Sequence, residues 1–315
     1  MAQALDVVTL GEAMLMLVAD QAGPLEQVTS YHKRTAGAET NVAIGLARLG
    51  LRVGWGSRLG DDSMGRYLLA EMQREGIDCS RVPLVAGERS GFQFKGKIEG
   101  GGDPPVEYHR KGSAASKMTV ADLDADWLRS ARHLHLTGVF AALSPNCLEV
   151  LQRAISLARE AGATISFDPN LRPTLWPSRE VMATTLNALA ARCDTVLPGI
   201  EEGQVLLGTR DPAAIARFYR GQGAARVIVK LGPDGAYYDD RDEGCGQVPA
   251  FPVAQVVDTV GAGDGFAAGV ISALLEGRSV ADAARRGAWI GARAVQVSGD
   301  TEGLPTRAQL EEAGL

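Results

Sequence analysis

The sequence predicts an α/β fold with a mostly parallel central sheet and helices on both of its faces. Strand and helix patterns alternate along most of the 315 residues, which is typical of parallel sheets with crossover helices. That length is ample for one large buried core. Residues 87–117 break the alternation, because they carry no helical pattern. We therefore expect a single α/β domain over residues 1–315, with a small β attachment.

The elements of the main sheet follow one another in order. Apolar or alternating runs that end at glycine or polar residues predict strands at 6–11, 52–60, 133–140, 163–170, 194–199 and 226–232. Apolar residues at helical spacing predict helices at 40–50, 63–76, 147–162, 179–192, 211–219, 263–277 and 279–296. Right-handed crossovers would place these helices on both faces and a ligand at the carboxyl ends of the strands.

The exceptional segment reads as a β-hairpin. SGFQFKGKIEG and VEYHRKGSA alternate like two strands, and GGGDPP between them is rich in turn residues. Together with residues 12–35, we expect this segment, about 87–117, to form a β lid over a substrate cleft. An oligomer contact and a hairpin without function are the alternatives.

Composition limits the partners. The net charge of -6 and the pI near 5.4 argue against general nucleic-acid binding, so the expected partner is small. The four cysteines lie far apart without a C-x-x-C pair, which indicates neither a disulfide framework nor a zinc site. No signal peptide or membrane span is apparent. We expect a cytoplasmic protein without membrane or nucleic-acid partners, and a homo-oligomer, because an exposed hairpin often pairs with a partner's edge.

The stretch DTVGAGDGFAAG, residues 258–269, carries the main chemical signal. Glycine amides at a helix N-terminus stabilise an anion such as a phosphoryl group in transfer. A carboxylate among them, Asp264, can take the proton of an attacking hydroxyl. The alternative is that Asp264 only caps a helix that starts near Gly265.

Other motifs are weaker. GFQFKGKI, residues 91–98, approaches P-loop spacing, but Ile98 replaces the required Ser or Thr and the stretch alternates as a strand. GAGDGF has Phe266 in place of the third glycine of a dinucleotide fingerprint. His133 and His135 would share one face of a strand as metal ligands, although strand histidines with ordinary hydrogen-bond partners are the expected alternative.

At these residues the chain resembles the ribokinase (PfkB) family of sugar kinases over nearly its whole length. Residues 258–271 fit the family's C-terminal signature, AGAETNVAIGLARLG (36–50) is similar to its N-terminal signature, and VKLGPDGAYY (229–238) matches its phosphate-donor stretch. The resemblance implies a ribokinase-like fold that binds ATP and Mg²⁺. It also implies that Asp264 is the catalytic base, that Gly261, Ala262 and Gly263 form the anion hole, and that residues 230–235 contribute to the ATP site.

Within the family, GAETNVA, YHRKGSA and FDPNLRPTLW look like 2-keto-3-deoxygluconate kinases. Arginine suits the carboxylate of an acidic sugar. The implied substrate-binding residues are Gly37, Ala38, Asn41, Tyr108, Arg110, Arg172 and Asp264. The implied ATP-binding residues are Asp168, Asn170, Lys230, Gly232, Gly235, Gly261 and Gly263. Arg110 would lie on the lid; the alternative for it is a solvated hairpin charge.

We therefore expect an ATP-dependent kinase that transfers the γ-phosphoryl group to a primary hydroxyl of 2-keto-3-deoxygluconate. A fructokinase or another neutral-sugar or nucleoside kinase of the same fold is the nearest alternative. A non-catalytic sugar sensor and a hydride-transferring enzyme are alternatives of other classes.

Three positions depart from the family pattern. Glu39 stands where many members have proline, and Gln93 stands where an acidic-sugar kinase would have an aromatic residue. Gly199 replaces the asparagine of an N-x-x-E spacing, while Glu202 is kept as a water-mediated Mg²⁺ ligand. The resemblance also places a monovalent-cation site near Asp258, and the sequence leaves its occupation open.

Overall fold

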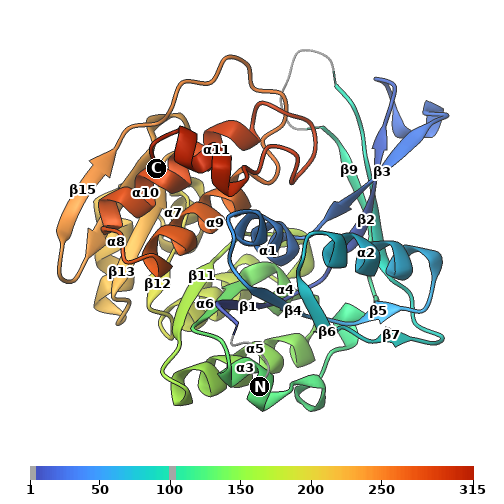
Figure 1. Ribbon diagram of the computed structural model, residues 1–315, viewed down its shortest axis with the longest axis horizontal. Coiled ribbons are helices and arrows are strands. Elements are labelled where there is room, and N and C mark those ends of the chain that lie inside the picture. Colours follow the sequence, from blue (N-terminus) through green and yellow to red (C-terminus); the bar gives the residue numbers. More distant parts are fainter. Residues whose placement is uncertain (1–4, 99–103) are drawn as a thin grey trace.

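A nine-stranded sheet runs through the centre of the computed structural model, which describes residues 5–98 and 104–315 (Figure 1). The strand order is β15-β14-β13-β12-β11-β10-β1-β4-β6. The strands are β1 (Val7–Leu10), β4 (Val53–Gly56), β6 (Asp78–Arg81), β10 (His133–Thr137), β11 (Thr164–Asp168), β12 (Thr195–Val196), β13 (Arg226–Lys230), β14 (Ala236–Asp240) and β15 (Gly244–Val248). All neighbours from β6 to β13 are parallel, whereas β14 and β15 are antiparallel additions at one edge.

Helices cover both faces of this sheet, as the sequence predicts (Figure 1). One face carries α3 (Ala125–Arg129), α4 (Gly138–Leu143), α5 (Pro145–Glu160), α6 (Arg179–Ala190), α7 (Ile200–Leu207) and α8 (Pro212–Gly221). The other carries α1 (Ala38–Arg48), α2 (Ser63–Arg74), α9 (Ala262–Leu275), α10 (Val280–Ala294) and α11 (Arg307–Glu312). None of the helices in the described ranges has the length and apolarity needed to cross a membrane.

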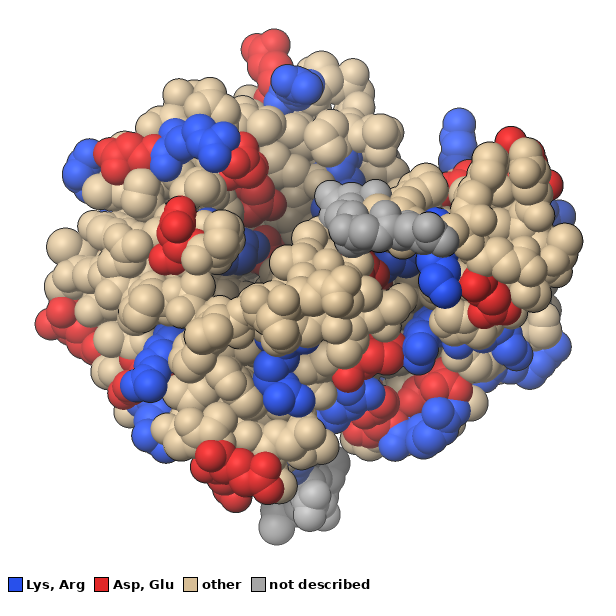
Figure 2. All heavy atoms as spheres, turned by 90° about the horizontal axis from the view of Figure 1, so that it is seen from above, with Lys and Arg blue, Asp and Glu red and all other residues tan. Residues whose placement is uncertain are grey.

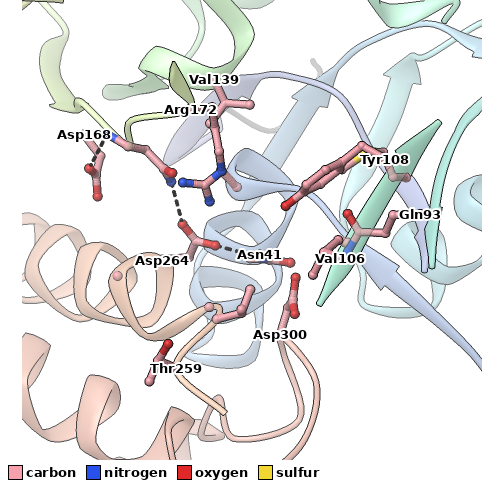
Figure 3. A pocket seen from close by; sticks show the side chains of 18 of the residues that line it. Asn41, Gln93, Val106, Tyr108, Val139, Asp168, Arg172, Thr259, Asp264 and Asp300 are labelled. Carbon is pink, nitrogen blue, oxygen red and sulfur yellow. Dashed lines mark hydrogen bonds between the residues drawn. The ribbon is translucent and has the colours of Figure 1, made fainter. Parts of the chain in front are cut away.

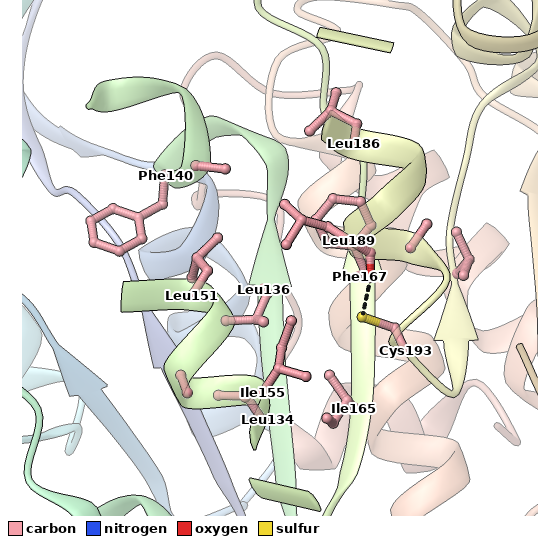
Figure 4. Packing of buried hydrophobic residues seen from close by; sticks show 14 of the residues in the cluster. Leu134, Leu136, Phe140, Leu151, Ile155, Ile165, Phe167, Leu186, Leu189 and Cys193 are labelled. Atoms are coloured by element: carbon pink, nitrogen blue, oxygen red, sulfur yellow. Dashed lines mark hydrogen bonds between the residues drawn. The ribbon is translucent and has the colours of Figure 1, made fainter. Parts of the chain in front are cut away.

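Each helix layer buries an apolar core against the sheet. Figure 4 shows Leu136 of β10 and Phe167 of β11 packed against Leu151 of α5 and Leu189 of α6, and all four side chains are buried. Burial of such apolar surface supplies the main stabilisation of the fold. The carboxyl ends of the strands are thereby held together on a rigid support.

The predicted lid is a separate four-stranded sheet in the order β3-β2-β8-β9. Its strands are β2 (Met14–Ala19), β3 (Tyr31–Ala36), β8 (Gly91–Lys95) and β9 (Val106–His109). The antiparallel pairing of β8 with β9 confirms the predicted hairpin, although residues 99–103 of its turn lie outside the described residues. A short parallel pair, β5 (Leu59–Gly60) and β7 (Leu84–Val85), lies beside it.

The weaker motif interpretations are resolved by this fold. The stretch at 91–98 begins with lid strand β8 and leads into no helix, so the P-loop interpretation is excluded. His133 and His135 are buried on β10, and each shares a hydrogen bond of 2.7 to 2.8 Å with the hydroxyl of Ser166. Burial lowers the pKa of each histidine to about 3. Hydroxyl partners occupy both ring nitrogens of His133 and Nδ1 of His135, whereas Nε2 of His135 has no partner among the described residues. These contacts are those of hydrogen-bonded strand histidines.

Charges are distributed evenly on one face of the molecule. Figure 2 shows acidic and basic side chains interspersed over the face that it presents, with small areas of either sign among the residues drawn in colour. Opposite charges on this face therefore offset one another locally.

Candidate active site

A cavity of about 410 Å³ lies between the lid and the carboxyl ends of the central strands, which is within the range of small-molecule sites. It collects most of the predicted site residues: Gly37, Ala38, Asn41, Tyr108, Arg110, Asp168, Asn170, Arg172, Glu202, Lys230, Gly261, Gly263 and Asp264 all line it. Ala262, Gly232 and Gly235 are not among the lining residues. Figure 3 shows the carboxylate of Asp264 and the guanidinium of Arg172 pointing into the same space.

Asp264 lies on the first turn of α9, which begins at Ala262, slightly earlier than the sequence predicts. The N-cap position belongs to Gly261 and Asp264 lies inside the helix, so the interpretation of Asp264 as a simple helix cap is wrong. Instead, Asn41 donates to one carboxylate oxygen at 2.8 Å, and Asn170 donates to the other at 3.3 Å. The carboxylate is therefore held by two amides from distant segments and faces the cavity.

Asn170 occupies a strained backbone position. Its φ of 39° is the one positive value among the described non-glycine residues, and such conformations persist where the surrounding structure enforces them. Asp168, at the end of β11, accepts a 3.1 Å hydrogen bond from the backbone N–H of Asn170. This turn aims the Asn170 amide at Asp264.

Burial makes the carboxyl group of Asp264 a much weaker acid than usual. It raises the pKa of Asp264 to about 8, the hydrogen bond from Asn41 opposes this rise, and the nearby carboxylates of Asp168 and Asp300 add to it. Once ionised, a carboxylate with such a pKa is a stronger base than an ordinary carboxylate, which suits it to accept a proton from a hydroxyl.

Gly261 and Gly263 lie at the N-cap and the second residue of α9. Gly261 has a φ of 84°, and a Cβ there would lie 2.4 Å from the backbone oxygen of Asp300. A Cβ on Gly263 would meet only the Nζ of Lys230, at 3.7 Å. The helix N-terminus and this ammonium thus face the same space, and both favour negative charge.

Lys230, at the end of β13, is itself ion-paired. Its Nζ lies 2.7 Å from Asp168 Oδ2 and 3.8 Å from Glu202 Oε2. Burial raises the pKa of Asp168 to about 6, although Lys230 opposes this rise. The three side chains place a compact charged group at the edge of the cavity next to the glycine loop.

The two predicted carboxylate-binding arginines differ. Arg110 is buried, and its Nε and one terminal nitrogen lie 2.7 and 2.6 Å from the same oxygen of Glu12; the interpretation of Arg110 as a solvated hairpin charge is therefore wrong. Among the described residues, the guanidinium of Arg172 has no carboxylate within ion-pair distance; it donates to the carbonyl of Leu171 at 2.8 Å and acts on Asp264 only through longer-range attraction. Arg172 thus keeps its charge available to a ligand.

Glu202, the predicted water-mediated metal ligand, caps α7. Its two oxygens accept hydrogen bonds from the backbone N–H groups of Gly199 at 2.7 Å and Leu171 at 3.1 Å. Because both oxygens have backbone partners, the arrangement suits an indirect contact with a metal better than direct ligation.

Gly232 and Gly235 shape the turn between β13 and β14. Both have positive φ values, and a Cβ on Gly235 would lie 2.1 Å from the backbone oxygen of Val248. Gly235 is thus required for the close approach of β15 to this turn. A contact of either glycine with ATP stays a prediction.

Several important residues were missed by the sequence analysis. Glu12 and Asp300 stand outside the recognised motifs, and no local pattern marks either one. Glu39, noted only as a departure, is buried beside Thr137, whose hydroxyl donates to it at 2.5 Å. Burial raises the pKa of Glu39 to about 7.

A carboxylate beside anion-binding amides, in a cavity between two sheets, is the arrangement of an enzyme that transfers a phosphoryl group to a hydroxyl. Comparison with known proteins gives the family. The chain belongs to the pfkB family of carbohydrate kinases, whose members it matches over residues 4–307.

Relatives cover nearly the whole chain. It is 48% identical over 312 residues to the 2-dehydro-3-deoxygluconokinase of Bacillus subtilis (strain 168), covering 97% of this chain and 94% of the relative. It is 32% identical to Fructokinase-1 of Oryza sativa subsp. japonica, with 96% of each chain covered.

Solved structures agree with the fold. The PfkB protein from Polaromonas sp. JS666 has 62% identity and a TM-score of 0.91, with coverage of 98% of this chain and 99% of that chain. An E. coli structure described as a ribokinase II in complex with ATP and Mg²⁺ has 26% identity and a TM-score of 0.89, with 98% of each chain covered. The ribokinase-like fold predicted from the sequence is thereby confirmed.

Proposed function

We propose that this protein is an ATP-dependent kinase that phosphorylates a primary hydroxyl of 2-keto-3-deoxygluconate, also called 2-dehydro-3-deoxygluconate. The observation that carries the proposal is the position of Asp264, which lies at the N-terminus of α9 and faces the same cavity as the uncommitted cation Arg172. The 48% identical relative of Bacillus subtilis bears the name of this activity.

In the proposed reaction, Asp264 accepts the proton of the attacking hydroxyl. The amides of the Gly261–Gly263 loop and the Lys230 ammonium stabilise the negative charge that grows on the transferred group. The lid covers the cavity, which keeps water from competing with the sugar as acceptor. Gly37, Ala38 and Tyr108 supply the remaining walls of the sugar site.

The acidic sugar is favoured by the polar groups that lack partners. Arg172 offers a guanidinium for a carboxylate, and Asn41 Oδ1 has no hydrogen-bond partner within the described part of the chain, so it can accept from a sugar hydroxyl. Arg110 is neutralised by Glu12. We therefore assign the substrate carboxylate primarily to Arg172, with Arg110 in a supporting position.

ATP and Mg²⁺ complete the proposed site. Lys230, Asp168 and Asn170 line its donor side, and Glu202 would hold Mg²⁺ through water, since its oxygens already accept backbone hydrogen bonds. Mg²⁺ usually keeps several waters and binds through substrate phosphates, which agrees with this donor set. When bound, the ion neutralises charge on the donor phosphates.

The test is ADP formation from Mg²⁺-ATP with 2-keto-3-deoxygluconate, its C4 epimer, fructose, ribose and adenosine as acceptors. Arg172→Met should lower kcat/KM for the acidic sugars by roughly tenfold to a hundredfold, as expected for a lost hydrogen bond to a charged group, and should affect neutral sugars less. Arg217→Met, at an exposed position, is the matched control. Equal losses for acidic and neutral sugars would contradict the assignment of Arg172.

A fructokinase is the second candidate, because the rice relative of that name is 32% identical over nearly the whole chain. A higher kcat/KM for fructose than for the acidic sugars in the same assay would favour it. The proposal also includes a cytoplasmic location, in keeping with four cysteines that are all free, and a homo-oligomer, which sedimentation equilibrium would test.

A further inference from the structure

Lys95, the last residue of lid strand β8, is buried between two carboxylates. Its Nζ lies 2.5 Å from Asp258 Oδ2 and 3.1 Å from Asp300 Oδ1, and its side chain is 1% exposed. Within the described residues no other cationic side chain lies within ion-pair distance of Asp258 or Asp300. Buried carboxylates are costly without a cation, so Lys95 supplies the charge that allows both to be buried.

Both carboxylates belong to segments that shape the glycine loop. Asp258 accepts hydrogen bonds from the backbone N–H groups of Val260 at 3.1 Å and Gly299 at 3.4 Å. Asp300 packs so closely against Gly261 that a Cβ on that glycine would lie 2.4 Å from its backbone oxygen. A shift of either aspartate would therefore move the loop that begins α9.

Lys95 is also charged in this setting. Burial alone would lower its pKa, but the carboxylates of Asp300 and Asp258 outweigh burial and raise the pKa above its ordinary value. Asp300 in turn contributes to the raised pKa of Asp264. The ammonium of a lid residue is thus linked to the predicted base through the charge of Asp300.

We propose that Lys95 is a positioning residue that provides, from within the chain, the positive charge that a monovalent cation near Asp258 would otherwise provide. It joins the lid to the anion-binding loop, so that the loop is ordered without a free cation. The contacts of Asp258 support this assignment. One of its carboxylate oxygens faces the ammonium of Lys95, and the other accepts a hydrogen bond from the backbone N–H of Val260. The proposal rests on the proposed phosphoryl transfer and adds a residue and an ion requirement to it.

The first experiment uses the wild-type chain. ADP formation with the preferred sugar is measured in potassium chloride, sodium chloride and tetramethylammonium chloride at equal ionic strength. We expect kcat to agree within about twofold among the three salts, because Lys95 already provides the positive charge. Equal ionic strength keeps general screening of charges the same in all three. A fall of roughly tenfold or more without potassium, equivalent to about 1.4 kcal/mol in barrier height, would overturn the proposal.

The second experiment removes the charge. Lys95→Ala leaves space for a small ion, and in tetramethylammonium we expect its kcat to fall by roughly tenfold to a hundredfold, as for a small misplacement of catalytic groups. Potassium or ammonium should restore part of the loss, and KM for ATP and for the sugar should change less than kcat. Lys97→Ala, an exposed lid position, is the control and should behave as wild type. An unchanged kcat for Lys95→Ala would refute the role of the charge. A reduced kcat that neither potassium nor ammonium restores would refute it as well.

Thermal midpoints give a readout that needs no turnover. For Lys95→Ala the midpoint should rise in potassium or ammonium chloride relative to tetramethylammonium chloride, whereas wild type and Lys97→Ala should show no such difference. Absence of an ion-specific shift in Lys95→Ala would count against the proposal. If wild type phosphorylates none of the sugars, the proposed function fails, while this measurement still decides the role of Lys95.

Discussion

Asn41, on the first turn of α1, donates a 2.8 Å hydrogen bond to Asp264, on the first turn of α9, across 223 positions of sequence. The predicted base is thus held where the N-termini of two helices meet. This hydrogen bond favours the charged carboxylate and lowers its pKa against the effect of burial. Asn41 therefore tunes the base as well as lining the sugar site.

Replacement of Asn41 should change the pH dependence of the reaction. In Asn41→Ala the pKa of Asp264 should rise, because one partner of the charged form is lost. The acid limb of the pH profile of kcat/KM should move to higher pH, and part of the lost activity should return above pH 8. A uniform loss at every pH would show that Asn41 acts only in substrate binding.

Asp264→Asn should abolish most turnover while retaining the fold. Loss of general-base catalysis lowers kcat by roughly a hundredfold to ten-thousandfold, measured as ADP formation under saturating substrates. Retained binding, measured by calorimetry with ATP, would separate this effect from misfolding. A near-normal kcat would show that Asp264 is not the base.

Asp264→Asn should also become more stable relative to wild type as the pH rises. Burial raises the pKa of Asp264 from 3.8 to about 8, so between these values the folded chain holds a proton that the unfolded chain releases. This group's contribution to stability is therefore present below pH 4 and is lost as the pH rises through 8. The thermal midpoint of Asp264→Asn, minus that of wild type, should be larger at pH 9 than at pH 5; an equal difference at both would contradict the raised pKa.

The buried pair of Arg110 and Glu12 should behave as a unit. Arg110→Met or Glu12→Gln alone leaves an uncompensated buried partner and should cost about 3–5 kcal/mol in the free energy of unfolding. The double variant should lose less than the sum of the two. Urea unfolding of all four chains measures the coupling.

A surface pair provides the control for this cycle. The exposed ion pair of Arg129 with Glu160 should contribute at most about 1 kcal/mol. If the double variant of the buried pair lost as much free energy of unfolding as the two single variants together, Arg110 and Glu12 would not be coupled. The exposed pair is expected to show such additive losses.

Gly138, the first residue of α4, has no room for a side chain. A Cβ there would lie 2.1 Å from the backbone oxygen of Pro169, next to Asn170 in the strained turn. Gly138→Ala should therefore displace this turn, lowering both the thermal midpoint and kcat. Gly221→Ala, where a Cβ would meet nothing within 4 Å, should stabilise or leave the protein unchanged, since alanine is favoured over glycine in helices by up to about 1 kcal/mol. Similar behaviour of the two variants would contradict the steric argument.

The sequence predicted the core of the fold well, because its strands and helices carry clear periodic patterns. Strands β10 and β11 and helices α5 and α9 all appear at or near their predicted positions. Strand direction at the edge could not be predicted, since β14 and β15 return by tight turns that periodicity does not distinguish from a crossover. The short elements β6, α4 and α7 were missed, because they span too few residues for a pattern.

The lid reverses the usual rule of apolar burial. Along β8 the buried face carries Gln93 and Lys95, while Phe92 and Phe94 are half-buried and pack with His109 at ring-centroid distances of 4.6 and 5.8 Å. A pattern argument would have turned the phenylalanines inward. The polar face is turned inward instead because it meets the cavity and its buried carboxylates, which come from distant segments.

At the site, the glycine-rich motif located Asp264, and stretches that resemble the family located Arg172 and Lys230. The motifs could not show which charged side chains form ion pairs in the folded protein. Arg110 looked free, yet its partner Glu12 stands 98 positions earlier. Such partners depend on which strand ends become neighbours in the folded sheet.

The order of the central sheet also has a consequence for biosynthesis. From β1 onward, strands β10 to β15 add to one edge in the order in which they leave the ribosome, so the sheet can extend step by step as the N-terminal part folds first. The predicted base, Asp264, is synthesised only with α9, and the first turn of α9 must then pack beside Asn41 of α1. A nascent chain can therefore carry most of its sheet and much of its sugar pocket well before it is able to consume ATP.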